Sequence, residues 1–175
     1  MVPKTYLITG AAGFIGAAVA KKFIEEGNTV VTIDNLKTGF KENLPKEIIF
    51  IAGDCASDNV LKKLNNYQFD IIIHIAGQSS GEISFDDPAY DLSTNALSTV
   101  KLLKFAIHNK CKKFIYASTM SVYGSNVKEK VNEDAKLDPI SFYAVGKIAS
   151  EQYLKIYSEY GLNCSALRLF NVYGP

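Results

Sequence analysis

Short apolar runs alternate along the chain with longer stretches in which apolar residues recur at helical spacing. The apolar runs predict strands over residues 6–9, 29–33, 47–51, 70–75, 113–117 and 163–169. The longer stretches predict helices over residues 14–26, 57–64, 88–109 and 140–160. In the third of these helices, one buried face is expected to carry Leu92, Ala96, Val100, Leu103 and Ile107.

The alternation of strands and helices indicates the fold class. The predicted strands are apolar throughout, which is typical of a parallel sheet covered on both faces. Right-handed crossovers then give a doubly wound α/β sheet. Such sheets bind ligands beyond the carboxyl ends of their strands, so the loops that follow the strands are where functional residues are expected.

Composition and charge exclude several classes of protein. With 47% hydrophobic residues, 21% charged residues and a net charge of +1, the chain is neither disordered nor a nucleic-acid binder driven by bulk charge. Its three cysteines are far apart and form no Cys/His cluster, so neither a disulfide framework nor a metal site is expected. No stretch approaches the ~20 apolar residues of a membrane span. A cytoplasmic protein without a membrane partner is expected.

A glycine-rich loop joins the first strand to the first helix, and it has the G-x-x-G-x-x-G spacing of a dinucleotide site. Its backbone N–H groups and the helix start suit a pyrophosphate. Gly16 would let the helix pack closely on the sheet, although glycines at this spacing are also compatible with a simple tight turn. The residues expected to contact the cofactor here are Gly10, Gly13, Phe14, Ile15 and Gly16.

Residues after the next three strands extend this predicted site. Asp34 ends the second strand, where a carboxylate would accept hydrogen bonds from both ribose hydroxyls of NAD and repel the extra phosphate of NADP. Lys37 is close enough to weaken that preference. Asp54, beside Cys55, is expected either to accept from the adenine amino group or to serve only as a turn residue.

Small residues follow the fourth strand. Ala76 and Gly77 would let the backbone approach the cofactor there. His74 lies inside that strand and is interpreted as a hydrogen-bonded core histidine rather than a ligand.

Tyr143 and Lys147 are candidates for catalysis. Spaced four residues apart, they share one face of the predicted helix. A fixed positive charge favours the phenolate form of a tyrosine, so Tyr143 could act as a general base. Ser118 and Thr119 follow the fifth strand, and their hydroxyls are expected to reach the same crevice.

These motifs together give the chain a resemblance to a known family. It resembles the N-terminal part of an extended short-chain dehydrogenase/reductase, in the NAD-dependent sugar epimerase/dehydratase family. The motifs that carry the resemblance, in family order, are residues 9–16, 34–36, 53–54 and 74–77, Asn95, residues 118–124, Tyr143 with Lys147, and residues 168–175.

The resemblance implies a Rossmann-like fold, NAD as cofactor and a set of site residues. Thr119, Tyr143 and Lys147 would be the catalytic residues. Ser118 would line the nicotinamide pocket, and Asn35 and Asn95 would lie beside the cofactor. Ser79, in the 78–82 loop, and Asn171 would contact substrate.

Two departures from the family pattern shape the expected function. Sugar-nucleotide 4,6-dehydratases carry an Asp-Glu pair after the catalytic hydroxyl residue, where this chain has Met120 and Ser121, so a dehydratase is disfavoured. The turn at residues 34–39 is instead similar to that of UDP-glucose 4-epimerases.

The second departure is length, because family members continue into a small C-terminal substrate domain. Residues 1–175 are therefore expected to be the NAD-binding domain of a truncated product.

The expected function is nucleotide-sugar epimerisation through a transient 4-keto sugar, with this chain inactive by itself. A reductase, decarboxylase or dehydratase of the same family, or a non-catalytic NAD-binding module, are the alternatives. The partners expected are a nucleotide sugar and a second copy of the chain, bound through helices 88–109 and 140–160. Along the second helix Ala149, Tyr153, Ile156 and Tyr160 recur beyond what one sheet-facing stripe needs.

Overall fold

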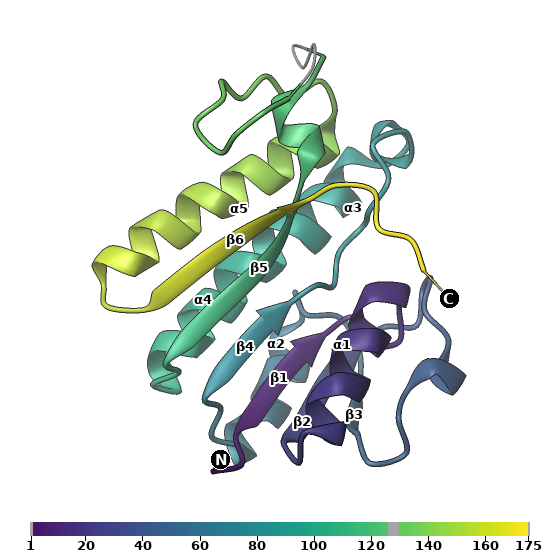
Figure 1. Ribbon diagram of the computed structural model, residues 1–175, viewed down its shortest axis with the longest axis vertical. Helices are drawn as coiled ribbons and strands as arrows, with labels where there is room; N and C mark the ends of the chain where they lie inside the picture. Colours follow the sequence, from purple (N-terminus) through teal and green to yellow (C-terminus); the bar gives the residue numbers. More distant parts are fainter. Residues whose placement is uncertain (1, 126–129, 175) are drawn as a thin grey trace.

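Six parallel strands form the centre of the computed structural model, which describes residues 2–125 and 130–174 (Figure 1). They are β1 (Thr5–Thr9), β2 (Thr29–Asp34), β3 (Ile49–Ala52), β4 (Ile71–His74), β5 (Lys113–Thr119) and β6 (Asn163–Leu169). The order across the sheet is β3-β2-β1-β4-β5-β6. This confirms the predicted doubly wound parallel sheet, and β1 and β4 are the neighbours at which the strand order reverses.

Helices connect the strands on both faces of the sheet. They are α1 (Phe14–Glu25), α2 (Asp58–Lys62), α3 (Pro88–Leu92), the π-helical segment η4 (Ser93–Leu97), α4 (Ser98–His108) and α5 (Phe142–Glu159). Short 3₁₀ turns occupy η1 (Lys41–Asn43), η2 (Lys63–Asn66), η3 (Ile83–Phe85) and η5 (Met120–Tyr123). Each predicted strand and helix is present, although the boundaries differ by a few residues.

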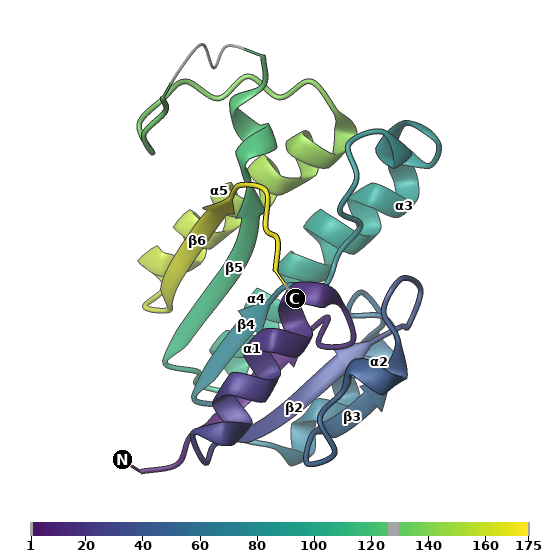
Figure 2. The same cartoon turned by 45° about the vertical axis from the view of Figure 1, so that its right-hand side comes forward.

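The hydrophobic core has two parts, one on each face of the sheet. On one face, α2, α4 and α5 pack on the strands through buried residues such as Leu61, Leu103 and Leu154. On the other face, Ala20 of α1 packs against Ile8 and Ile73. Figure 2 shows α1 on one side of the sheet, and α4 and α5 on the other.

The predicted helix over residues 88–109 contains a π-helical segment, which changes its buried face. Leu92 was expected in the core, but it is 59% exposed. The π turn inserts an extra residue into the helical repeat, so the residues before it rotate relative to those after it. Asp91 and Asn95 occupy the buried face in this part of the helix, followed by Leu102.

Strand β5 is two residues longer than the sequence pattern predicted. It pairs with β6 along its whole length, from Lys113 opposite Asn163 to Thr119 opposite Leu169. Ser118 and Thr119 are therefore fixed in the sheet rather than in the loop that follows it. Beyond β6, the described chain passes the carboxyl ends of the strands and runs toward the start of α1 (Figures 1 and 2).

Candidate functional site

The glycine loop lies at the reversal of strand order, where the loops after β1 and β4 touch. Gly10 has φ of +75°, and a Cβ atom there would lie 2.8 Å from the backbone nitrogen of Ala76. A Cβ atom on Gly16 would lie only 2.1 Å from the carbonyl oxygen of Gly10. Glycine at these two positions lets the first turn of α1 and the β4 loop close around the end of β1.

The start of α1 offers an open group of backbone donors. Gly13 is the N-cap residue, and the first intrahelical hydrogen bond runs from the Ala17 N–H to the Gly13 carbonyl. The N–H groups of Phe14 and Ile15 therefore have no acceptor within the helix. The first turn carries no acidic residue, and a Cβ atom on Gly13 would have only the Gly10 carbonyl, 3.4 Å away, as a neighbour. This cradle fits the pyrophosphate of a dinucleotide.

Asp34 joins this loop to the one after β2. Its carboxylate is 8% exposed and accepts hydrogen bonds from the N–H groups of Ala12 (2.9 Å) and Leu36 (2.8 Å). Leu36 adopts a left-handed conformation with φ of +57°. Asn35, between Asp34 and Leu36, is exposed, and its side-chain oxygen accepts a hydrogen bond from the Lys37 N–H at 3.0 Å. The Lys37 ammonium lies 3.4 Å from the centre of the Tyr90 ring.

The residues predicted after β3 are held in a turn. One carboxylate oxygen of Asp54 accepts from the Ala56 N–H at 2.7 Å, which is the contact expected of a turn residue. Cys55 is buried, and burial raises the pKa of its thiol. The side chain of Cys55 therefore belongs to the core, and only its backbone could contact a ligand.

The end of β4 is fixed by a buried chain of hydrogen bonds. The Thr9 hydroxyl accepts from the N–H groups of Ile75 and Ala76, so its own proton is free to bond Nδ1 of His74 at 2.7 Å. Nε2 of His74 lies 3.2 Å from the Ser98 hydroxyl, which donates to a backbone carbonyl of η4. Burial lowers the pKa of His74 to about 3, so the ring is neutral. The interpretation of His74 as a hydrogen-bonded core residue is confirmed.

The predicted catalytic residues converge where β5 meets α5. Tyr143 is 8% exposed and Lys147 is 4% exposed. Nζ of Lys147 donates to the carbonyl of Ala117 at 2.9 Å, and it lies 5.6 Å from the centre of the Tyr143 ring. Burial lowers the pKa of Lys147, whereas Tyr143 and Asp91 raise it.

Thr119 lies at the end of β5, and its hydroxyl is engaged within its own turn. It accepts from the Ser121 N–H and bonds the Ser121 hydroxyl, both at 3.2 Å. The side chain is 8% exposed. This places Thr119 at the rim of a cavity that Ser121 lines.

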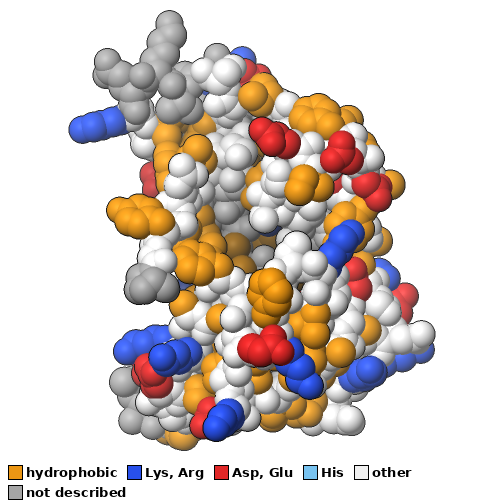
Figure 3. Space-filling view, turned by 90° about the vertical axis from the view of Figure 1, so that its right-hand side faces the viewer, with side chains coloured by type: hydrophobic (Ala, Val, Ile, Leu, Met, Phe, Trp, Pro, Cys, Tyr) orange, Lys and Arg blue, Asp and Glu red, His pale blue; other side chains and the backbone are white. Residues whose placement is uncertain are grey.

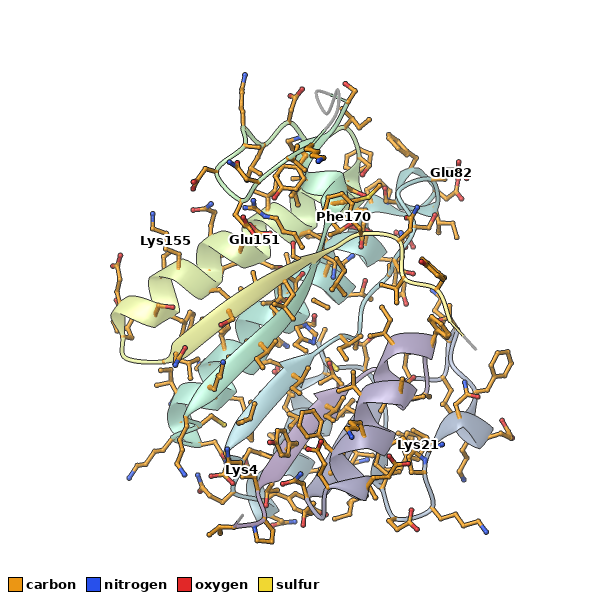
Figure 4. All side chains as sticks on the ribbon, viewed as in Figure 1. Lys4, Lys21, Glu82, Glu151, Lys155 and Phe170 are labelled. Atoms are coloured by element: carbon orange, nitrogen blue, oxygen red, sulfur yellow. The ribbon has the colours of Figure 1, made fainter. Side chains whose placement is uncertain are left out.

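Ser118 instead belongs to a partly buried ionic cluster that the sequence pattern did not indicate. Its hydroxyl donates to Glu151 of α5 at 2.5 Å. Arg168 of β6 donates to both carboxylate oxygens of Glu151, the shortest contact being 2.7 Å, and to the Tyr123 hydroxyl at 3.0 Å. The Glu151 label in Figure 4 lies between α5 and β6. Glu151 follows Lys147 by four residues, so the sequence alone could have placed both side chains on the same face of α5.

Beyond the carboxyl end of β5 lies a cavity of about 390 Å³. Its walls come from the loop after β4, from η5, from the start of α5 and from the segment after β6. They comprise Gly81, Glu82, Phe85, Met120, Ser121, Tyr123, Gly124, Ile140, Ser141 and Phe170. Figure 3 shows hydrophobic side chains around a hollow on this side of the molecule, and Figure 4 labels Glu82 and Phe170.

The two predicted substrate residues flank this cavity without lining it. Ser79 precedes Gly81 in the β4 loop, and Asn171 follows Phe170; both side chains are exposed. Asn95 lies on the other side of the β4 loop and donates from Nδ2 to the Gln78 carbonyl at 3.1 Å. A Cβ atom on Gly77 would lie 2.4 Å from Oδ1 of Asn95. Pro175, the last residue of the family-like motif, lies outside the described residues.

Residues 2–125 and 130–174 contain neither a metal cluster nor a candidate membrane span. No group of three or more His, Cys, Asp and Glu side chains there could hold a metal ion. Nor does any helix in these ranges have the length and apolar character needed to cross a membrane.

Comparisons with known proteins match the geometry. Residues 6–175 match the NAD dependent epimerase/dehydratase family. A UDP-glucose 4-epimerase of Mycolicibacterium smegmatis is 36% identical over 97% of this chain. The crystal structure of a UDP-glucose 4-epimerase from Thermotoga maritima with UDP-glucose superposes with a TM-score of 0.94 at 38% identity, over 98% of this chain. That of a Thermus thermophilus UDP-glucose 4-epimerase in complex with NAD superposes with a TM-score of 0.93 at 35% identity, also over 98%.

The matched proteins are considerably longer. This chain covers 56% of the M. smegmatis protein, 57% of the T. maritima structure and 56% of the T. thermophilus structure. It therefore spans about half the length of these relatives.

Proposed function

The chain belongs to the NAD dependent epimerase/dehydratase family, and from this premise we propose that it is the NAD-binding, catalytic half of a UDP-sugar 4-epimerase. The observation that supports this most directly is the buried pair of Tyr143 and Lys147 beside the carboxyl end of β5. A protein that only bound a dinucleotide would have no use for a buried tyrosine next to a buried ammonium.

We propose NAD as the cofactor of this site. The phosphates would lie on the N–H groups at the start of α1, where the open cradle at Gly13 fits them. Asp34 would accept from the adenine ribose, since a carboxylate retains lone pairs beyond its two backbone contacts. Bound NAD would supply a reversible acceptor for the hydride of a sugar carbon. The residues proposed to contact it are Gly10, Gly13, Phe14, Ile15, Gly16, Asp34, Asn35, Asp54, Cys55, Ala76, Gly77, Asn95, Ser118, Tyr143 and Lys147.

The chain's own residues would act on the C4 hydroxyl of the sugar. Tyr143 would remove its proton as the C4–H bond breaks, leaving a 4-keto sugar. Thr119 would orient the oxygen, and Lys147 would supply the positive charge that favours the phenolate. Rotation of the keto sugar would expose its other face, so that C4 regains the hydride on that face as Tyr143 returns the proton to the oxygen. Substrate would also contact Ser79 and Asn171.

Epimerisation fits these residues better than dehydration does. Removal of water across C5–C6 needs an acid and a base near the sugar, and the positions after Thr119 are occupied by Met120 and Ser121. Met120 contributes an apolar wall to the cavity instead. A reductase or a decarboxylase that shares the first oxidation step is the alternative within the family.

The nucleotide part of the substrate would require a further domain. The relatives of this chain extend well beyond the matched half, and we propose that a counterpart of that portion holds the nucleotide. Residues 1–175 alone would then bind NAD without turning over UDP-sugars, because positioning can account for ~7–11 kcal/mol of a barrier.

The experiment compares this chain with a chimera in which the C-terminal portion of the T. maritima epimerase follows residue 175. UDP-glucose and UDP-galactose interconversion is measured at equal protein concentration with NAD present. We expect the chimera to be active and residues 1–175 by themselves to be inactive. Comparable activity of the chain by itself would show that the substrate site is misplaced, and a folded, NAD-bound chimera without activity on any UDP-sugar would contradict the proposed function.

NAD is expected to bind at least about tenfold more tightly than NADP, since the 2′-phosphate would lie against the Asp34 carboxylate at a cost of ~4 kcal/mol at close range before screening. Lys37 cannot fully offset this, because its ammonium is engaged on the Tyr90 ring. Calorimetric titration of both cofactors measures the ratio. Asp34→Asn is expected to reduce the preference for NAD over NADP. Equal affinities of the unmodified chain for the two cofactors would contradict the proposal that Asp34 binds the ribose hydroxyls.

We also propose a homodimer through helices 88–109 and 140–160. Exposed apolar side chains follow the outer face of α5 at helical spacing, beside the half-buried Ala149; they are Phe142, Val145, Tyr153, Ile156 and Tyr160. Leu92 and Leu97 add exposed apolar surface on α3 and η4. Helices that carry such stripes on their solvent side are typical of interfaces.

Tyr153→Glu is expected to convert the dimer to a monomer, because it places a charge at the centre of this stripe. Sedimentation velocity measures the change. Ala18→Glu introduces the same charge at an exposed position of α1, on the opposite face of the sheet, and should leave the dimer intact. A monomer in the unmodified protein at high concentration would mean that these apolar residues are only scattered surface residues.

A further inference from the structure

Asp91 is a buried carboxylate whose charge has no direct partner. It is the penultimate residue of α3, one turn before Asn95, and it is 1% exposed. Its Oδ2 accepts from Nε2 of Gln78 and from Nδ2 of Asn95, both at 3.1 Å. Its Oδ1 has no hydrogen-bond partner among the described residues. Neutral amides do not balance a buried charge, so a nearby cation would stabilise the ionised form of this carboxylate.

The free oxygen of Asp91 faces α5 at Gly146, the residue before Lys147. A Cβ atom on Gly146 would lie 3.4 Å from Oδ1 of Asp91, so α3 and α5 meet closely at this point. Gly146 directly precedes Lys147 in the helix. The absence of a side chain on Gly146 lets the carboxylate approach the backbone of α5 one residue before Lys147.

The other titratable groups around Lys147 do not supply a balancing negative charge. Tyr116 and Tyr143 offer their ring faces, with Nζ 4.7 Å and 5.6 Å from the ring centres. His74 is neutral, because burial holds its pKa at about 3. Glu151 is already paired with Arg168. The mutual influence agrees with this placement: Lys147 lowers the pKa of Asp91 against the rise caused by burial, and Asp91 raises that of Lys147.

We propose that Asp91 is a positioning residue, the buried counter-charge that keeps Lys147 protonated between Tyr116 and Tyr143. This assignment rests on the proposed function in so far as it makes Lys147 part of the catalytic set. It gives a reason for an acidic residue on the buried face of a helix, where an apolar one would otherwise be expected.

The same carboxylate also connects Lys147 to the wall of the cavity. Gln78, which donates to Asp91, bonds the backbone of Ser80 through both ends of its amide. The loop continues directly into Gly81, which lines the cavity. Asp91 thus fixes the β4 loop and balances Lys147 through one side chain.

The test measures the protonation of Lys147 directly. NMR signals of the lysine Cε and Nζ atoms are recorded across a range of pH in the unmodified chain and in the Asp91→Asn variant. The Lys147 signal is identified by its loss in Lys147→Arg. Asparagine keeps the size of Asp91 and an oxygen for the two amide donors but removes the charge. A nearby opposite charge favours the protonated form of a lysine, so the pKa of Lys147 is expected to fall when Asp91 loses its charge.

Asp87→Asn is the matched control, because Asp87 caps the same helix from an exposed position and asparagine caps equally well. It should leave the Lys147 titration unchanged. A folded Asp91→Asn protein with an unchanged Lys147 titration would overturn the proposal. A role of Asp91 confined to packing would lower the melting temperature without moving this pKa.

A reciprocal variant covers the case in which Asp91→Asn does not fold. Lys147→Met removes the cation, so carboxyl NMR is expected to show a higher pKa for Asp91; an unchanged value contradicts the pairing. Neither measurement depends on turnover. Loss of the proposed function would leave these titrations as predicted, whereas failure of the titrations would leave NAD binding and epimerisation untouched.

Discussion

Tyr143→Phe is expected to lower UDP-hexose interconversion by at least about two orders of magnitude, the usual contribution of a general acid–base group. The substitution removes one hydroxyl and keeps the buried ring that lies 5.6 Å from Nζ of Lys147. Packing of α5 on the sheet and the affinity for NAD should therefore change little. The measurement is turnover of the chimera described above, with NAD affinity determined in the same preparation.

Tyr67→Phe is the control for this substitution. Tyr67 lies before β4, at the amino ends of the strands, whereas the glycine loop lies at their carboxyl ends. Its ring packs against that of Phe69. Its hydroxyl has no part in the proposed reaction, so turnover should be unaffected. If the Tyr143→Phe protein retained near-normal turnover, another group would have to be the base.

The largest expected effect on stability comes from Glu151→Ala. The Glu151 and Arg168 side chains are only 10% and 19% exposed, and the carboxylate accepts hydrogen bonds from Arg168 and Ser118. Removing one partner of a buried ion pair costs about 3–5 kcal/mol, and for this partly exposed pair a loss at the lower end, about 3 kcal/mol, is expected. For a domain of this size, a loss on that scale is a large share of the free energy of unfolding. Urea unfolding monitored by circular dichroism measures it.

Asp58→Ala provides the comparison at the surface. Asp58 pairs with Lys101 at 2.8 Å, a distance similar to that between Glu151 and Arg168, but its side chain is 76% exposed. Solvent screens such a pair, so the urea midpoint should barely move. Equal destabilisation by both substitutions would show that burial is not what gives the Glu151–Arg168 pair its strength.

The sequence by itself determined the fold class and most of the elements. The β-strands are short and apolar, and the helices are long enough for their period to be read, so local pattern and element length agree. The glycine loop could be placed at the end of β1 for the same reason. Its close contact with Ala76 follows once β1 and β4 are neighbours, which the doubly wound order requires.

Only the tertiary structure decided which polar residues are buried together. Asp91 faces Gly146, and Glu151 bonds both Ser118 and Arg168, across elements far apart in the sequence. These contacts depend on how closely α3 and α5 pack and on which face of α5 turns toward the sheet, and a local hydrophobic period carries no information about either. The π turn of η4 adds to this, because one inserted residue rotates Asp91 into the core and Leu92 out of it.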